Sequence, residues 1–205
     1  MAVNIRLGQG SNRQDVTLQP AHNRGPLLAR CVLGEDQAWR DLHRDYYPVA
    51  SRFLRRMGVF VDELDDACQE VFVQVFRYLA RFQQRAGFQT WLYKLCLSQA
   101  SRVRRRRRVH AALDWLLGRE GRIPAGTAEP EWSDSMTARR VEQVLGRMKP
   151  LHREVFVLFE LEGVGGNEIA RVLRCRPATV RRRLHYARQE FESLLCAETA
   201  EEKQS

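Results

Sequence analysis

Long apolar runs are missing from this 205-residue sequence. A helix that crosses a membrane needs about 20 consecutive apolar residues, and the N-terminus also lacks the apolar segment of a secretory signal. We therefore expect a cytoplasmic protein without membrane insertion.

Cysteine is scarce and scattered. The five cysteines (Cys31, Cys68, Cys96, Cys175 and Cys196) are odd in number and form no Cys-x-x-Cys pair. This pattern argues against a disulfide framework or a zinc ribbon and fits a reducing compartment. Most of them fall on apolar helical faces, where cysteine usually packs as a small core residue.

Catalytic motifs are missing as well. The five histidines are scattered, with no His-Glu-x-x-His and no nucleophile beside them. The glycines at 163–166 follow a predicted helix rather than a strand, so they do not form a dinucleotide loop. We expect no catalytic residue, no metal site and no cofactor.

What the sequence does have is clustered positive charge, mostly arginine, with a formal net charge of +9. Guanidinium groups match phosphates and guanine edges, so clustering favours a nucleic-acid partner over a merely basic surface. A hydrophobic fraction of 44% is enough for a packed core.

The most basic cluster lies within residues 165–188, which carry seven arginines and no acidic residue from Arg171 onward. Apolar spacing predicts one short helix over 168–173 and another over 179–188, with Pro177 suited to the start of the second. Two short helices, a tight turn and a basic second helix describe a helix-turn-helix, whose second helix can enter a DNA major groove.

Helical periodicity covers most of the remaining chain, and no strand alternation or solenoid repeat is present. Three longer helices are predicted over 35–57, over 62–82, and from 88 to an arginine run at 102–108. Gly58 closes the first of them. Helices of this length with short connections form an all-α bundle.

Shifts in composition divide the chain into two helical domains joined by a flexible linker, the C-terminal domain containing the helix-turn-helix. The expected segments are a disordered N-terminal extension (1–25), a first domain (26–117), a linker (118–133), a second domain (134–196) and a flexible tail (197–205).

Two features of the first domain admit two interpretations. The carboxylates at 62–66 complement the dipole of the helix that they open, or they belong to a docking surface with the polar face that follows. The aromatics around Trp91 pack in the core, or they stack on unpaired bases beside the arginines. The residues alone leave both questions open.

Together these segments resemble a bacterial RNA polymerase sigma factor of the extracytoplasmic-function (ECF) family, group IV of the sigma-70-like proteins. The resemblance covers residues 27–108 and 138–195. Its most specific motifs are Asp65-Asp66-Ala67-Cys68-Gln69-Glu70-Val71-Phe72, Phe88-Gln89-Thr90-Trp91-Leu92-Tyr93-Lys94, Arg153-Glu154-Val155-Phe156, Glu160-Leu161-Glu162-Gly163 and Glu168-Ile169-Ala170.

The resemblance implies a protein that binds core RNA polymerase and directs promoter-specific transcription initiation. The first domain would be sigma region 2, which docks on the polymerase and melts the −10 element, and the second would be sigma region 4, which reads the −35 element. The implied partners are the clamp helices and flap of the large polymerase subunits, promoter DNA and an anti-sigma factor.

The resemblance also implies three sets of binding residues. The polymerase set is Asp65, Asp66, Gln69, Glu70 and Gln74. The set for the −10 single strand is Tyr78, Arg81, Phe82, Phe88, Trp91, Tyr93, Lys94, Ser98, Arg102 and Arg105. The −35 set is Arg176, Pro177, Ala178, Thr179, Arg181, Arg182, Arg183, His185, Tyr186 and Arg188.

Several residues depart from the family's pattern. Ser98 and Arg102 stand where Asn and Asp are common, which leaves the preferred −10 sequence open. Arg174 stands where a turn glycine is frequent, and a left-handed conformation there would cost about 1–2 kcal/mol. Gly165-Gly166-Asn167 replaces the usual start of the first short helix, and Arg176 replaces a hydroxyl cap.

Two other functions remain open. A free-standing helix-turn-helix repressor or activator would explain residues 165–188 but would leave the acidic and arginine-rich helices without a role. A helical interaction protein or an enzyme with an incidental basic surface has no motif to support it.

Overall fold

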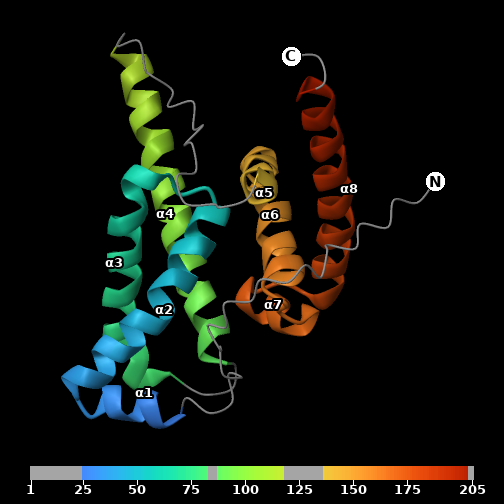
Figure 1. The fold of residues 1–205 in the computed structure, drawn as a ribbon. Coiled ribbons are helices and arrows are strands. Elements are labelled where there is room, and N and C mark those ends of the chain that lie inside the picture. Colours follow the sequence, from blue (N-terminus) through green and yellow to red (C-terminus); the bar gives the residue numbers. More distant parts are fainter. Residues whose placement is uncertain (1–24, 83–86, 118–135, 203–205) are drawn as a thin grey trace.

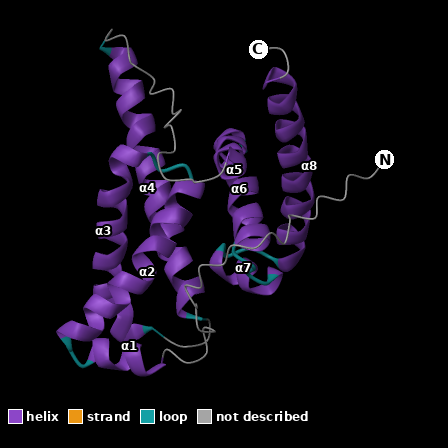
Figure 2. Cartoon of the chain, in the orientation of Figure 1, coloured by secondary structure: helices purple, strands orange, loops and turns teal. Residues whose placement is uncertain are grey.

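The structure is a computed structural model that describes residues 25–82, 87–117 and 136–202. Within these ranges every regular element is a helix and none is a strand (Figure 2). The predicted all-α fold is confirmed. No helix in the described ranges is both long enough and apolar enough to cross a membrane.

The described residues of the first domain form four α-helices, which are labelled in Figure 1. They are α1 (Gly25–Val32), α2 (Asp36–Arg56), α3 (Val61–Tyr78) and α4 (Phe88–Leu116), with a 3-10 turn at Leu79–Arg81. The three longer helices pack on one another, and α1 crosses the end of this bundle that carries the start of α2 (Figure 1).

The apolar stripes of the three longer helices meet in one core, as the helical spacing predicted. Phe53 and Leu54 of α2, Val71 of α3 and Leu92 of α4 have no exposed surface. Fully burying a side chain of this size stabilises the fold by about 1.5–3 kcal/mol. Gly58 follows α2 with a φ of 84°, the left-handed conformation expected of a glycine that closes a helix.

From residue 136 onward the described part of the second domain forms four more α-helices, α5 (Met136–Arg147), α6 (Pro150–Phe156), α7 (Gly166–Val172) and α8 (Pro177–Glu202). A π-helical turn, Val157–Leu161, extends α6. The core of this domain includes Leu145, Val155, Leu158 and Ile169, each at most 1% exposed.

Three predicted boundaries were wrong. The helix predicted over 62–82 ends as α3 at Tyr78 and is followed by the 3-10 turn. The arginine helix does not end at 108 but continues as α4 to Leu116. The predicted tail is helical over 197–202, because Ala197 and the Glu-rich residues after it are good helix formers that prolong α8. The N-terminal extension up to residue 24 and the linker over 118–133 lie outside the described residues.

The two domains touch each other. Helix α5 packs beside α2, and α7 packs beside α4 (Figure 1). The helix-turn-helix therefore lies directly against the arginine-rich helix of the first domain.

Candidate nucleic-acid interface

Helices α7 and α8 form the predicted helix-turn-helix. Its turn is closed by two backbone hydrogen bonds, in which the Leu173 N–H donates to the Ile169 carbonyl (2.8 Å) and the Cys175 N–H donates to the Ala170 carbonyl (3.0 Å). Arg174 lies in this turn with a φ of 49°, the left-handed conformation that was anticipated from its place in the sequence. Pro177 is the first residue of α8, also as predicted.

The start of α8 presents most of the predicted −35 residues to solvent. The exposed members are Arg176, Pro177, Ala178, Arg181, Arg182, His185, Tyr186 and Arg188, whereas Thr179 and Arg183 are half-buried. The opposite face holds Val180, Leu184 and Ala187 in the core, which fixes the rotation of the helix about its axis.

Three of these side chains are already engaged within the second domain. Arg188 forms an ion pair with Glu160, with an Nη2–Oε1 distance of 2.6 Å. The Tyr186 ring stacks on His152, and their centroids are 6.3 Å apart. Arg183 lies close enough to Glu154 to lower the pKa of that carboxyl, although burial has the larger, raising effect.

One face of α4 gathers the basic and polar residues that were predicted to contact the −10 strand. Lys94, Ser98, Arg102 and Arg105 are exposed and follow one another at steps of three or four residues, so they form a single stripe along the helix. Half-buried Trp91 stands one step before Lys94 on the same face. We call these five residues the α4 stripe.

Three other arginines of the 102–108 run, Arg104, Arg106 and Arg107, point elsewhere. Arg106 and Arg107 pair with Glu63 at the start of α3, and the Arg107 guanidinium also lies 3.4 Å from the centroid of the Phe60 ring. Arg104 turns toward the second domain. The acidic opening of α3 therefore has partners beyond its own helix dipole.

Two predicted −10 residues are buried instead. Phe88 is 5% exposed and packs against Tyr46 and Phe82, with centroids 4.7 and 5.9 Å away. Tyr93 is 1% exposed and stacks on Phe53 at 4.5 Å. Both face the interior because their side of α4 packs on α2, so neither ring can stack on a base in this conformation.

The other predicted −10 residues lie at the end of α3 and just after it. Tyr78 and Arg81 are exposed, and Phe82 is half-buried against Trp91, with ring centroids 5.1 Å apart. Residues 83–86, between Phe82 and Phe88 of this set, lie outside the described residues.

The predicted polymerase residues share one face of α3. Asp65, Asp66, Gln69 and Glu70 are exposed, whereas Gln74 is half-buried. This face also carries two exposed apolar side chains, Val73 and Phe76, at 41% and 67% exposure. Acidic groups beside exposed apolar surface are typical of a protein-binding site.

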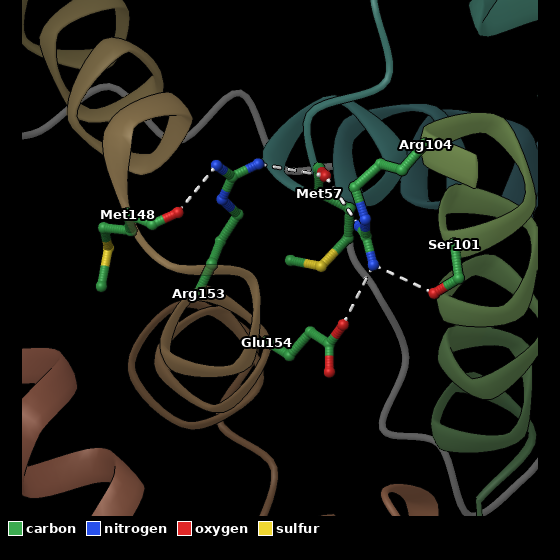
Figure 3. A network of polar contacts seen from close by, with 6 residues as sticks. All are labelled: Met57, Ser101, Arg104, Met148, Arg153 and Glu154. Atoms are coloured by element: carbon green, nitrogen blue, oxygen red, sulfur yellow. Dashed lines mark hydrogen bonds and ion pairs between the residues drawn. The ribbon is translucent and has the colours of Figure 1, made fainter. Parts of the chain in front are cut away.

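A polar network joins the two domains, and Arg153 of α6 lies at its centre (Figure 3). Its guanidinium donates to the Met57 carbonyl of the first domain (3.2 Å) and to the Gly146 and Met148 carbonyls of its own domain (2.6 and 3.1 Å). Arg153 is 7% exposed. Burial lowers the pKa of Arg153 to about 10, so the side chain remains charged at neutral pH.

Arg104 meets this network from the first domain (Figure 3). It donates to the Met57 carbonyl and to Glu154 Oε1, both at 3.2 Å. Burial raises the pKa of the Glu154 carboxyl, and the neighbouring Arg104 charge opposes that rise.

Two further ion pairs cross the interface. Arg55 Nη2 lies 2.6 Å from Glu142 Oε2, and Arg56 Nη1 lies 2.6 Å from Glu162 Oε1. Glu162 also accepts a hydrogen bond from the Tyr93 hydroxyl. Burial raises the pKa of Tyr93, and the Glu162 charge raises it further, so the phenol stays protonated.

The sequence motifs do not predict this interface. Arg153, Glu154, Glu162 and Tyr93 were all singled out as motif residues, but nothing in the motifs says that they meet. The only available signal was charge within apolar surroundings, as in Arg153-Glu154-Val155-Phe156, because such charges need partners once buried.

The five cysteines are free thiols that differ in their exposure. Cys31, Cys68 and Cys96 are buried free thiols, Cys175 is half-buried and Cys196 is exposed. Burial raises the pKa of Cys68 to about 11. In the described part of the chain no group of three His, Cys, Asp or Glu residues is arranged to hold a metal ion.

Comparison with known sequences identifies both domains. Residues 42–109 match the family "Sigma-70 region 2", and residues 138–191 match "Sigma-70, region 4". Together the two matched segments cover more than half of the chain.

Similar proteins include the ECF RNA polymerase sigma factor SigE of Mycolicibacterium smegmatis, which is 29% identical over 82% of this chain and 65% of its own length. The sigma factor CarQ of Myxococcus xanthus is 28% identical over 79% of this chain and 91% of its own. CnrH of Cupriavidus metallidurans is 28% identical over 84% and 94%.

Two solved structures of sigma factors have a similar fold. CnrH in complex with the cytosolic domain of CnrY superposes with a TM-score of 0.61 at 26% identity, covering 84% of this chain and 96% of CnrH. The sigma factor RpoE of Bartonella quintana, solved with the anti-sigma factor NepR, has the same fold, with a TM-score of 0.64 at 18% identity and coverages of 76% and 95%.

Proteins with these two regions direct promoter-specific transcription initiation and are initiation factors rather than catalysts. The matched regions occur in the expected order, one in each helical domain. The similar proteins are RNA polymerase sigma factors. The chain belongs to the ECF family of RNA polymerase sigma factors.

Proposed function

We propose that the first domain binds core RNA polymerase through the exposed face of α3 and holds the melted −10 strand along the α4 stripe, while the start of α8 reads the −35 element. The exposed arginines at the start of α8 carry this proposal, because a helix that presents a basic face to solvent can enter a major groove.

At the −35 element the exposed residues divide between two tasks. Arg181 and Arg182 lie in the first turns of α8 and are placed to reach base edges, where a bidentate contact to guanine contributes about 1–3 kcal/mol of discrimination. Arg176, just before the helix, is suited to a phosphate contact that sets the register.

At the −10 element the α4 stripe combines what a single strand requires. Lys94, Arg102 and Arg105 offer charge to the backbone, and Trp91 offers a ring on which a base can stack. Opening duplex DNA costs about 1.4 kcal/mol per base-pair step in lost stacking. Contacts with the displaced strand offset that cost.

The proposed protein partners follow from the α3 face and from the relatives. Asp66, Gln69 and Glu70 with their apolar neighbours would dock on the polymerase clamp helices, and the second domain would lie near the flap. CnrH was solved with the cytosolic domain of CnrY, and we propose that an anti-sigma factor likewise binds this chain.

The test is run-off transcription with purified core polymerase and a promoter that depends on its −35 element. Arg181→Ala/Arg182→Ala should lower initiation by at least about tenfold if each side chain contributes even 1 kcal/mol of base or phosphate contact. Capture of core polymerase should be unchanged. The matched control is Arg40→Ala/Arg44→Ala, which removes the same charge from an exposed face of α2.

Loss of polymerase capture in the α8 variant would contradict the assignment of surfaces. Tight binding to duplex DNA without polymerase, on a two-fold symmetric site, would instead identify a free-standing helix-turn-helix regulator. The remaining alternative is a helical interaction protein or an enzyme whose basic surface is incidental. A salt titration of DNA binding tests it, because phosphate contacts make the affinity fall steeply with salt, whereas an incidental basic surface gives a flat dependence.

A further inference from the structure

Arg174 occupies a position of the helix-turn-helix whose backbone favours glycine. Among the described residues it is the only one other than glycine with a positive φ, 49°. The Arg174 N–H donates to the Arg171 carbonyl (3.4 Å), and the Cys175 N–H donates to the Ala170 carbonyl (3.0 Å). These two bonds end α7 as a Schellman motif, in which the left-handed residue is usually glycine and sometimes asparagine. The turn itself therefore gives no reason for an arginine.

The Arg174 side chain does not offset this strain through a polar contact. It is exposed, and its guanidinium has no hydrogen-bond or ion-pair partner among the residues that the structure describes. Arg188 of the same helix-turn-helix differs, because Glu160 pairs with it. A residue held in a sparsely populated backbone conformation indicates a functional role when its internal contacts do not account for it.

The charge around the turn favours an anion as the ligand of Arg174. No acidic residue lies between Glu168 and Glu190 in the sequence. Arg176, two residues further on, is exposed as well, and α8 begins directly after it at Pro177. Positive charge gathered without carboxylates attracts anions. When the first residues of a recognition helix enter a major groove, the anions beside them are the backbone phosphates of the DNA.

We infer that Arg174 binds a backbone phosphate at the edge of the −35 element. The contact positions α8 and reads no base, because Arg174 precedes the helix instead of lying on the face that enters the groove. This inference rests on the proposed function, and it adds a residue that the predicted −35 set does not contain. The strained turn is retained because its side chain binds DNA.

A phosphate contact can be recognised in the salt dependence of promoter binding. Each contact contributes about 0.9 to the slope of log affinity against log salt concentration, so without it the affinity falls about 3.5-fold less between about 50 and 200 mM salt. The measurement uses holoenzyme, reconstituted from core polymerase and the full chain, with a promoter that depends on its −35 element. Arg174→Ala and Arg174→Gly should both show the smaller slope. Arg174→Lys keeps the charge and should keep the slope of the unmodified protein.

Arg174→Gly separates this role from a purely structural one. Glycine relieves the positive φ, so the variant should melt above the unmodified protein while binding the promoter more weakly. A residue with only a structural role would move stability and promoter binding in the same direction. Arg40→Ala removes an exposed arginine from α2. It is the matched control and should leave the salt slope unchanged.

Neutral phosphates locate the contact on the DNA. A methylphosphonate removes the charge of a single phosphate, and it is moved step by step along the −35 element. At one position it should weaken binding by the unmodified holoenzyme without further weakening binding by Arg174→Ala, because both changes remove the same interaction. At the other positions the two losses should add.

An unchanged salt slope in both Arg174→Ala and Arg174→Gly, or additive losses at every phosphate, would overturn the inference. A changed base preference at −35 with the slope retained would also overturn it, because that result assigns a base contact. Failure of the proposed function gives a different result. The unmodified holoenzyme would then show no dependence on the −35 element, and Arg181→Ala/Arg182→Ala would bind the promoter as tightly as the control.

Discussion

Substitution of Gly58 measures how much the Arg153 contact contributes to the stability of the protein. It has a φ of 84° and faces Arg153, so a Cβ added in Gly58→Ala would collide with the guanidinium Nη1. Gly34 has nearly the same φ, 85°, and a Cβ there would meet no atom within 4 Å. Gly34→Ala is therefore a matched control that carries the backbone strain without the collision.

The expected free-energy changes separate backbone strain from loss of the Arg153 hydrogen bond. A left-handed alanine costs about 1–2 kcal/mol, and reduced freedom of the unfolded chain returns about 0.4–1 kcal/mol. Both variants share these contributions. Gly58→Ala should in addition displace Arg153 from the Met57 carbonyl, and a hydrogen bond to a charged group contributes about 1.5–3 kcal/mol.

Thermal unfolding followed by circular dichroism tests the difference. At about 2–4 °C per kcal/mol for a chain of this size, Gly58→Ala should melt roughly 3–12 °C below Gly34→Ala. Equal melting temperatures in the two variants would refute the claim that Arg153 holds this interface.

Three other outcomes are expected. Arg174→Gly should raise the melting temperature by relieving a φ of 49°, whereas Arg174→Ala should not, because alanine keeps the left-handed cost of about 1–2 kcal/mol; equal effects would contradict this. Thiol titration of the native protein should show Cys196 reacting fast, Cys175 more slowly, and Cys31, Cys68 and Cys96 only on unfolding; rapid reaction of all five would contradict the fold. Arg102→Ala/Arg105→Ala should slow promoter opening, measured by permanganate reactivity of the −10 thymines, while Arg106→Ala, whose charge is paired with Glu63, should not; an equal effect of both would contradict the α4 stripe.

Much of the fold and part of the candidate site follow from local patterns. Helical spacing predicts the long helices of the first domain, Gly58 closes α2, and Pro177 begins α8. The exposed members of the α4 stripe share one face because the helix repeats every 3.6 residues. For the same reason the acidic and polar residues of α3 line up on one side.

Local patterns fail where a helix packs on more than one side. Both Phe88 and Tyr93 were expected beside DNA, yet each lies in the core because α4 contacts α2, α3 and α7. Periodicity states which residues share a face, but it does not state which faces are covered. The extent of α8 beyond 196 depended on helix propensity in a segment too polar to show a period.

The sequence by itself determined that this is a two-domain helical sigma factor with a basic helix-turn-helix, because those features depend on residues close together in the chain. Only the tertiary structure decided that the domains rest against each other. The Arg153 contact joins residues 96 positions apart and ends on a backbone carbonyl. Every residue has such a carbonyl, so no side-chain pattern could mark the one that Arg153 binds.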